Sequence, residues 1–197
     1  AATHVFAEKG LDGATMTDIA GQAGINKATI YLYFESKDAL VQAIAEDLFA
    51  RELADLRQAS VSPGSATARL TAFYGGLIAE GPQVLPMMPV IYEFYAVGLR
   101  DEGVRQVLAD FLDEWTAILA RMIREGVASG EFSSNLDPRR TARTLVALLE
   151  GVFLQWAYAP HGFEVEATLR HGVGLVFRAL MNHEATSLPS GAGEPPP

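Results

Sequence analysis

The sequence contains no cysteine. This absence excludes disulfides, thiolate metal ligands, thiol redox sensing and a cysteine nucleophile. No apolar run is long enough to span a bilayer, and the first residues do not have the pattern of a secretory signal peptide. We therefore expect a cytoplasmic protein with no membrane partner. Residue 1 already lies within a helical pattern, so we also expect further residues upstream of it.

Basic residues are scarce. The chain has 15 lysines and arginines against 24 aspartates and glutamates, which gives a formal net charge of −9. Phosphate contacts dominate nucleic-acid affinity, so nucleic-acid-binding domains usually have a basic surface. The three lysines, Lys9, Lys27 and Lys37, all lie within residues 1–40, together with five acidic residues. The acidic remainder indicates that the C-terminal part does not touch nucleic acid.

Motifs for catalysis or metal binding are also missing. The four histidines are scattered and form no two-histidine helical motif, and there is no nucleophile elbow or phosphate loop. Gly172 and Gly174 do not form a phosphate-binding glycine motif, because no strand precedes them and no third glycine follows them. The cluster of Asp110, Asp113 and Glu114 lacks the histidine of di-metal bundles, which indicates a solvated helix face. We expect no metal and no cofactor. These absences make a helical enzyme the weakest hypothesis for the function of this chain.

No strand pattern of useful length is found, and the apolar residues, 49% of the total, follow a helical period. A chain of 197 residues has ample material for one large or two small cores. The sequence predicts an all-α fold. Besides two short helices in residues 15–37, helices are predicted over residues 1–9, 36–59, 66–80, 82–98, 101–129, 137–158 and 165–182. Pro86 and Pro89 predict a kink in the helix over 82–98.

Residues 15–37 predict two short helices joined by a tight turn. Thr15 to Asp18 has the form of a capping box, which starts the first of them. Gly24 suits a position where a helix must end with a positive φ. Asn26 can cap the second helix, from Lys27 to about residue 34. This is a helix-turn-helix, in which the second helix is presented to a major groove of DNA.

The pattern resembles the TetR family of bacterial transcriptional regulators. The residues that carry the resemblance are Thr15, Ile19, Ala20, Ala23, Gly24, Ile25, Thr29, Ile30, Tyr31, Tyr33, Phe34, Lys37 and Leu40. The family implies a three-helix DNA-binding domain over residues 1–45, joined by a long helix to an effector-binding and dimerisation domain over 46–183. From its composition we expect residues 184–197 to form a flexible tail.

The resemblance also implies which residues contact a palindromic double-stranded operator. They are Thr15, Thr17, Asn26, Lys27, Ala28, Thr29, Tyr31, Tyr33 and Lys37. Lys27 and Thr29 are the candidates for base or backbone contacts, while Tyr31, Tyr33 and Lys37 are expected to hold phosphates. The alternative for the apolar residues of this helix is a place in the domain core, which we expect for Ile30 and Phe34.

Residues 85–95 concentrate methionine and aromatic side chains around kinking prolines. Such side chains at helical spacing are usually plain core, but the family implies an effector cavity, and effector pockets are mostly apolar. The predicted lining is Phe73, Tyr74, Met87, Met88, Tyr92, Tyr95, Trp115 and Met122. We expect a small, largely hydrophobic effector, and we expect Glu93 on a solvated outer face.

The helices predicted over 137–158 and 165–182 are apolar on more than one side, so they need burial on more than one side. A two-fold dimer that pairs both helices with their copies would provide it. The predicted interface is Leu145, Leu149, Val152, Phe153, Trp156, Leu169, Val173, Val176, Phe177 and Leu180. Such a dimer would set two recognition helices about 34–36 Å apart.

The resemblance implies a transcriptional repressor that an effector releases from its operator. It does not imply an enzyme. The acidic balance supports one other hypothesis, a helical small-molecule-binding protein that does not bind DNA.

Overall fold

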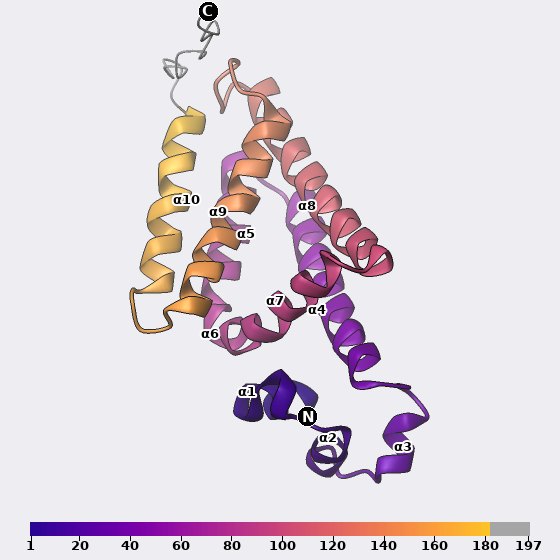
Figure 1. Cartoon of the computed structure of the whole chain (residues 1–197). Helices are drawn as coiled ribbons and strands as arrows, with labels where there is room; N and C mark the ends of the chain where they lie inside the picture. Colours follow the sequence, from indigo (N-terminus) through magenta and orange to yellow (C-terminus); the bar gives the residue numbers. More distant parts are fainter. Residues whose placement is uncertain (182–197) are drawn as a thin grey trace, which may run out of the picture.

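A computed structural model describes residues 1–181 of the chain, and this part is helical, with no strand (Figure 1). The all-α prediction is confirmed. No helix within residues 1–181 is long and apolar enough to cross a membrane. The tail predicted over 184–197 lies outside the described residues.

The N-terminal helices are α1 (Ala2–Gly13), α2 (Met16–Gln22) and α3 (Lys27–Tyr31). Their small core is closed by the first turns of α4 (Lys37–Val61), and its buried residues include Val5, Phe6, Met16, Ile19, Ile30, Leu40 and Val41. The predicted break at Gly10 is present, but a further helical turn after it was not predicted. Gly10 takes a φ of 71°, which kinks the helix, and helical structure then resumes as far as Gly13.

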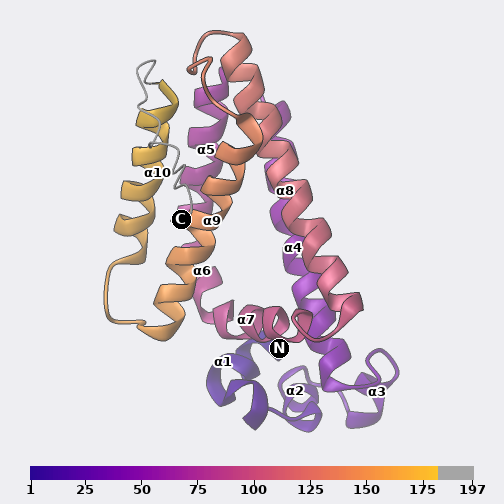
Figure 2. The same cartoon turned by 45° about the horizontal axis from the view of Figure 1, so that its top comes forward.

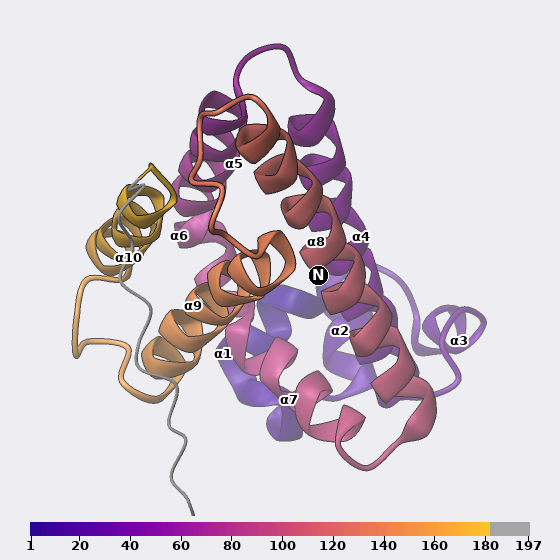
Figure 3. The same ribbon diagram turned by 90° about the horizontal axis from the view of Figure 1, so that it is seen from above.

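The remaining helices form one larger core. They are α5 (Ala66–Ala79), α6 (Gly81–Val84), the 3₁₀ turn η1 (Leu85–Met87), α7 (Met88–Gly98), α8 (Glu102–Ala128), α9 (Pro138–Tyr158) and α10 (Val165–Met181). Seen from above, α9 lies between α8 and α10, and α10 is outermost (Figure 3). The long helix α4 runs from the N-terminal helices up along α8 (Figure 1).

The kink predicted over 82–98 is confirmed, and prolines explain its form. Pro82, Pro86 and Pro89 each stand in the first two positions of a separate short element, α6, η1 and α7. At the start of a helix the missing N–H of proline has no intrahelical partner to lose. The segment is therefore three short pieces instead of one strained helix.

The two cores touch through α7. Figure 2 shows α7 lying beside α1, and the side chain of Val90 is buried within the N-terminal core. Val90 is 3% exposed, and the partly buried side chains of Leu11 and Ile44 pack against the same core. A residue of the C-terminal region thus completes the core of the helix-turn-helix domain.

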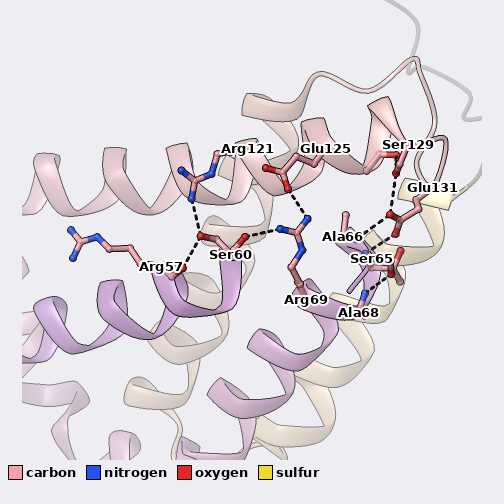
Figure 4. Close-up of polar contacts among 12 residues, drawn as sticks. Arg57, Ser60, Ser65, Ala66, Ala68, Arg69, Arg121, Glu125, Ser129 and Glu131 are labelled. Atoms are coloured by element: carbon pink, nitrogen blue, oxygen red, sulfur yellow. Dashed lines mark hydrogen bonds and ion pairs between the residues drawn. The ribbon is translucent and has the colours of Figure 1, made fainter. Parts of the chain in front are cut away.

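A network of polar contacts fixes the far end of α4 (Figure 4). The buried Ser60 hydroxyl donates to the carbonyl of Arg57 at 2.7 Å and accepts from Arg121 at 2.8 Å. Arg69 donates to the Ser60 carbonyl and to the Glu125 carboxylate, both at 2.6 Å. Charge-assisted bonds of this kind are stronger than neutral ones. They tie α4, α5 and α8 together at the end distant from the N-terminal domain.

Glu131 adds a second fixed point beside this network (Figure 4). Its carboxylate accepts from the backbone N–H groups of Thr67 at 3.0 Å and Ala66 at 3.1 Å, at the start of α5. These bonds lower the pKa of Glu131 to about 2. A carboxylate at a helix N-terminus also interacts favourably with the helix dipole.

Candidate nucleic-acid interface and effector cavity

The turn before α2 is built by a capping box. The Thr15 hydroxyl accepts from the Asp18 N–H at 3.1 Å and donates to the Asp18 carboxylate at 2.6 Å. Lys9 also reaches this carboxylate, at 2.6 Å. The bonds from Lys9 and Thr15 lower the pKa of Asp18 to about 2. The Thr15 hydroxyl is therefore used within the domain, whereas Thr17 is exposed.

The recognition helix α3 starts at Asn26, whose side-chain oxygen accepts from the Thr29 N–H at 2.8 Å and from its hydroxyl at 3.0 Å. Lys27 and Ala28 are exposed on its first turn. The Lys27 ammonium lies 5.9 Å from the centre of the Tyr31 ring, within the range of a cation–π contact. One face of α3 thus combines a positive charge with a phenol.

The tyrosines predicted to face outward do so. Tyr31 is 44% exposed and Tyr33 is 77% exposed, while Ile30 is buried in the core as predicted. Phe34 is partly buried against the same core. Leu32, which the sequence analysis did not select, is 82% exposed. A leucine so exposed beside two exposed tyrosines is a further candidate for apolar contact with DNA, for example with a thymine methyl group.

Lys37 has partners inside the domain. Its ammonium donates to the carbonyl of Leu11 at 2.8 Å and approaches that of Ala14 at 3.4 Å. These contacts tie the start of α4 to the end of α1, where a cation also suits the helix dipole. A phosphate contact by Lys37 remains a prediction, and it would require the ammonium to exchange or share these bonds. The partners of Lys37 lie at least 23 residues away, so local sequence gave no sign of them.

The C-terminal region contains a cavity of about 980 Å³. Its walls come mainly from α4 and α5, with α7, α8 and α9 closing it. Of the eight predicted lining residues, five are at its surface: Phe73, Met87, Met88, Tyr95 and Trp115. Phe153, predicted to lie in the dimer interface, lines this cavity as well. A volume of this size suits a small-molecule ligand.

The other three predicted lining residues do not reach the cavity, and this part of the prediction is wrong. Tyr74 and Met122 are 1% and 0% exposed and fill the core between helices. Tyr92 is partly buried, and its hydroxyl donates to the backbone carbonyl of Glu150 at 3.3 Å. The helical period shows that these side chains point inward, but not whether they meet a cavity or other side chains.

Two carboxyl groups that the sequence analysis missed also line the cavity. They belong to Glu52 on α4 and Glu150 on α9. Burial raises the pKa of Glu52 to about 8, and the negative charges of Glu150, Asp55 and Glu80 add to the effect. Burial also raises the pKa of Glu150, although a bond from the Tyr95 hydroxyl at 3.3 Å acts against it. Glu93, predicted to lie on a solvated outer face, is exposed.

Replacing Glu52 by glutamine is expected to change the stability relative to the parent protein. The gain in the free energy of unfolding is expected to be larger at pH 8 than at pH 5. Because burial raises its pKa from 4.5 to about 8, folded Glu52 binds more protons than unfolded Glu52 between these values. Its contribution to stability is full below pH 4.5 and is lost as the pH rises to about 8. A pKa difference of one corresponds to about 1.4 kcal/mol, and partial exposure reduces the effect, so the gain at pH 8 is about 2 kcal/mol.

Urea unfolding of the parent and the glutamine variant at the two pH values measures this difference. Glu46→Gln, an exposed position on the same helix outside the cavity, is the matched control. Equal stability changes in the two variants at both pH values would contradict the assignment.

The predicted dimer interface needs correction. Seven of its ten residues are at most 8% exposed within a single protomer: Leu145, Leu149, Val152, Phe153, Leu169, Val173 and Leu180. They pack against α5, α8 and each other, so they have no surface left for a second copy. Trp156, Val176 and Phe177 are partly buried, and Phe177 packs edge-on against Tyr74 at 5.9 Å.

An apolar surface nevertheless remains on the outer side of the last two helices. Leu154 and Tyr158 on α9 are 42% and 86% exposed, and Leu175 and Met181 on α10 are 50% and 46% exposed. We call these four residues the outer apolar face. Leu154, Tyr158 and Leu175 lie on a different side of their helices from most of the residues predicted for the interface, whereas Met181 lies one turn after the predicted residue Phe177.

These features define a helical DNA-binding regulator with a ligand-sized cavity. Residues 1–44 match the family model described as bacterial regulatory proteins, tetR family. Residues 81–178 match a model described as the C-terminal part of a BetI-type transcriptional repressor. The chain is 30% identical over 150 residues to the HTH-type transcriptional regulator YvdT of Bacillus subtilis, covering 76% of this chain and 75% of that one. The protein belongs to the TetR family of transcriptional regulators.

Solved structures give the same fold. A TetR-family regulator from Rhodococcus sp. superimposes with a TM-score of 0.73 and 28% identity, covering 92% of this chain and 95% of that one. The regulator FadR of Bacillus subtilis in complex with stearoyl-CoA superimposes with a TM-score of 0.71, covering 93% and 96%. FadR is 21% identical, so this likeness extends to the fold alone.

Proposed function

We propose that the protein is a homodimeric repressor that releases a palindromic operator when a small effector occupies the cavity between α4 and α5. The observation that carries the proposal is the make-up of the cavity wall. Ile44 and Leu48 of α4, Met88 of α7 and Thr3 of α1 all line it. The same three helices contribute to the core of the helix-turn-helix domain. A ligand that displaces the cavity wall would therefore also displace that domain.

The outer apolar face supports the dimer. It consists of large apolar side chains exposed on two adjacent helices, and exposed apolar surface commonly marks an interaction site. Burying it against a second copy about a two-fold axis would pair two recognition helices, as a palindromic operator requires. An operator in the bacterial chromosome also entails a cytoplasmic location.

The two alternatives are now weaker. A small-molecule-binding protein without DNA binding was suggested by the negative charge, but the chain belongs to a family of DNA-binding regulators. Proteins of such a family are generally not enzymes.

Replacing Lys27 by alanine is expected to lower operator affinity by about five- to tenfold and to reduce the slope of log affinity against log salt by about one. The reason is that Lys27 is an exposed cation on the first turn of α3, and each phosphate contact releases a counterion. Gel shifts with the DNA upstream of the protein's own gene, over a range of salt concentrations, measure both quantities.

Arg105→Ala is the matched control, because Arg105 is an exposed cation paired with Glu102 in the C-terminal region. It should leave the affinity and the salt slope unchanged. If the full chain bound no such DNA, or if Lys27→Ala behaved like the control, this account of operator binding would be wrong.

A further inference from the structure

The two carboxyl groups in the cavity have no cation to balance them. Within residues 1–181 the Glu52 carboxyl group forms no hydrogen bond or ion pair, and the Glu150 carboxyl group accepts only from the Tyr95 hydroxyl, at 3.3 Å. Burying a charged group without a partner is costly, so such groups usually have a function. The cavity therefore contains acidic groups that the protein alone leaves unsatisfied.

The nearest cations of the cavity wall are already engaged. Arg51 pairs with Asp47 at 2.7 Å. Arg69 donates to the Ser60 carbonyl and to Glu125, both at 2.6 Å, in the network that fixes the end of α4 (Figure 4). The wall also includes Asp55 and Glu80. With Asp47, Glu52 and Glu150 they make five acidic residues, against two arginines that are bonded to other partners. Acidic side chains in the wall thus outnumber basic ones.

The rest of the wall is apolar and aromatic. Phe49, Phe73, Tyr95, Trp115 and Phe153 line it. The faces of aromatic rings attract cations, and more strongly when water is excluded. Methionines add adaptable apolar surface. A wall of this kind suits the apolar body of a ligand whose charged end meets the carboxyl groups.

Two buried donors of residues in the wall, Arg69 Nε and Trp115 Nε1, also lack a partner among the described residues. Trp115 is 4% exposed, and its Nε1 has no hydrogen-bond partner among the described residues. Buried N–H groups are nearly always bonded, so an unbonded one beside a cavity indicates a group that a ligand completes. This observation is independent of the acidic residues and points to the same cavity as a binding site.

We propose that the cavity binds an organic cation with an apolar body, and that the positive group of this ligand lies against Glu52 and Glu150. The inference deepens the proposed function, since it names the chemical class of the effector. Anionic amphiphiles, such as fatty acids and their thioesters with coenzyme A, would meet the same carboxyl groups and be repelled. A neutral apolar ligand, bound while the two carboxyl groups share a proton, is the competing account.

Three probes with the same ten-carbon chain distinguish these accounts: decyltrimethylammonium, decanol and decanoate. Each is titrated below its micelle concentration into the full-length protein, and binding is measured by calorimetry. We expect the cation to bind at least about tenfold more tightly than decanol, and decanoate to bind no better than decanol. Decanol or decanoate binding as tightly as the cation would overturn the inference, and this comparison requires no variant.

Two variants then test the residues. Glu52→Gln and Glu150→Gln are each expected to weaken binding of the cation by at least about tenfold and to change binding of decanol by less than about twofold. Glu46→Gln is the control and should change neither. Melting curves identify a variant that does not fold, in which case the other variant decides. Cation binding that is unchanged in both folded variants would also overturn the inference.

None of these titrations contains DNA. A protein that bound the cation but no operator would disprove the proposed repressor and leave this inference intact. A protein that bound its operator but preferred decanoate would disprove this inference and leave the proposed repressor intact.

Discussion

Replacing Leu154 and Leu175 together by arginine is expected to convert the protein to a monomer and to lower its operator affinity by at least about 100-fold. Both residues belong to the outer apolar face, at 42% and 50% exposed, so the folded protomer accepts longer polar side chains there. In a two-fold interface each substitution occurs twice and brings like charges together. Such juxtaposition costs several kcal/mol.

The effect on DNA is large because it acts through pairing and not through any DNA contact. In a dimer, binding of one recognition helix holds the second beside its half-site, which raises avidity by about 10²–10⁴ over a single site. A separated protomer loses this gain. Its own basic surface is small, because the three lysines of the chain share the first 40 residues with five acidic residues.

Light scattering measures the oligomeric state, and gel shifts with the upstream DNA measure the affinity. Leu99→Arg is the matched control, since Leu99 is 83% exposed at the turn between α7 and α8, on the other side of the molecule from α10 (Figure 1). The control should remain dimeric and bind normally. A double variant that stays dimeric would show that the outer apolar face is not the interface. A monomer with unchanged affinity would show that pairing does not strengthen binding.

The helices and their ends were predictable from the sequence because their signals are local. Ser36, Ser65, Asp101 and Asp137 each accept a backbone N–H at the start of the helix that the sequence places there. Capping needs only the cap residue and the next turn, so no tertiary knowledge is required. The resemblance over residues 15–37 rests on the same kind of short-range pattern.

Which apolar face of a helix is buried, and which remains at the surface, was not predictable from such patterns. Leu149 and Leu154 are both apolar residues of α9, yet the first is 0% exposed and the second 42%. The helical period distinguishes faces only when one of them is polar, and α9 is apolar on several. Which face meets α5 and α8, and which stays outside, depends on packing between segments far apart in the sequence.

The two carboxyl groups of the cavity were missed for a related reason. Glu52 lies on α4, where charged residues are frequent, and Glu150 interrupts an apolar stretch of α9. Only the fold shows that the cavity between these helices receives both side chains. An acidic residue within an otherwise apolar stretch is the one signal that the sequence offers at Glu150.

The fixed and movable parts of α4 suggest how the cavity can influence DNA binding. Its C-terminal end is held by Ser60, through Arg69 and Arg121 (Figure 4). Its N-terminal end belongs to the helix-turn-helix core and lies beside the cavity at Ile44 and Leu48. A ligand that spreads the wall is therefore expected to displace the N-terminal end, together with the recognition helix. Such a displacement needs a contact that transmits it.

Val90 is the residue best placed to transmit this displacement. Among residues 1–181, it is the one buried residue of the N-terminal core that comes from beyond α4. Its neighbours Met88 and Ile91 line the cavity, so a ligand that moves α7 also moves Val90 within the other core. Removing two methyl groups by substitution with alanine costs about 1.6 kcal/mol of buried apolar contact. This is within the range of about 1–3 kcal/mol that typical allosteric couplings have.

We therefore expect Val90→Ala to reduce the release of operator by decyltrimethylammonium at least about fivefold, while binding of this probe in the absence of DNA changes less than about twofold. Gel shifts with and without the probe measure release, and calorimetry measures probe binding. Val97→Ala removes the same two methyl groups from the same helix, but Val97 packs against the C-terminal core, so its coupling should remain. Equal release in the parent and the Val90 variant would mean that the displacement reaches the recognition helix through α4 alone.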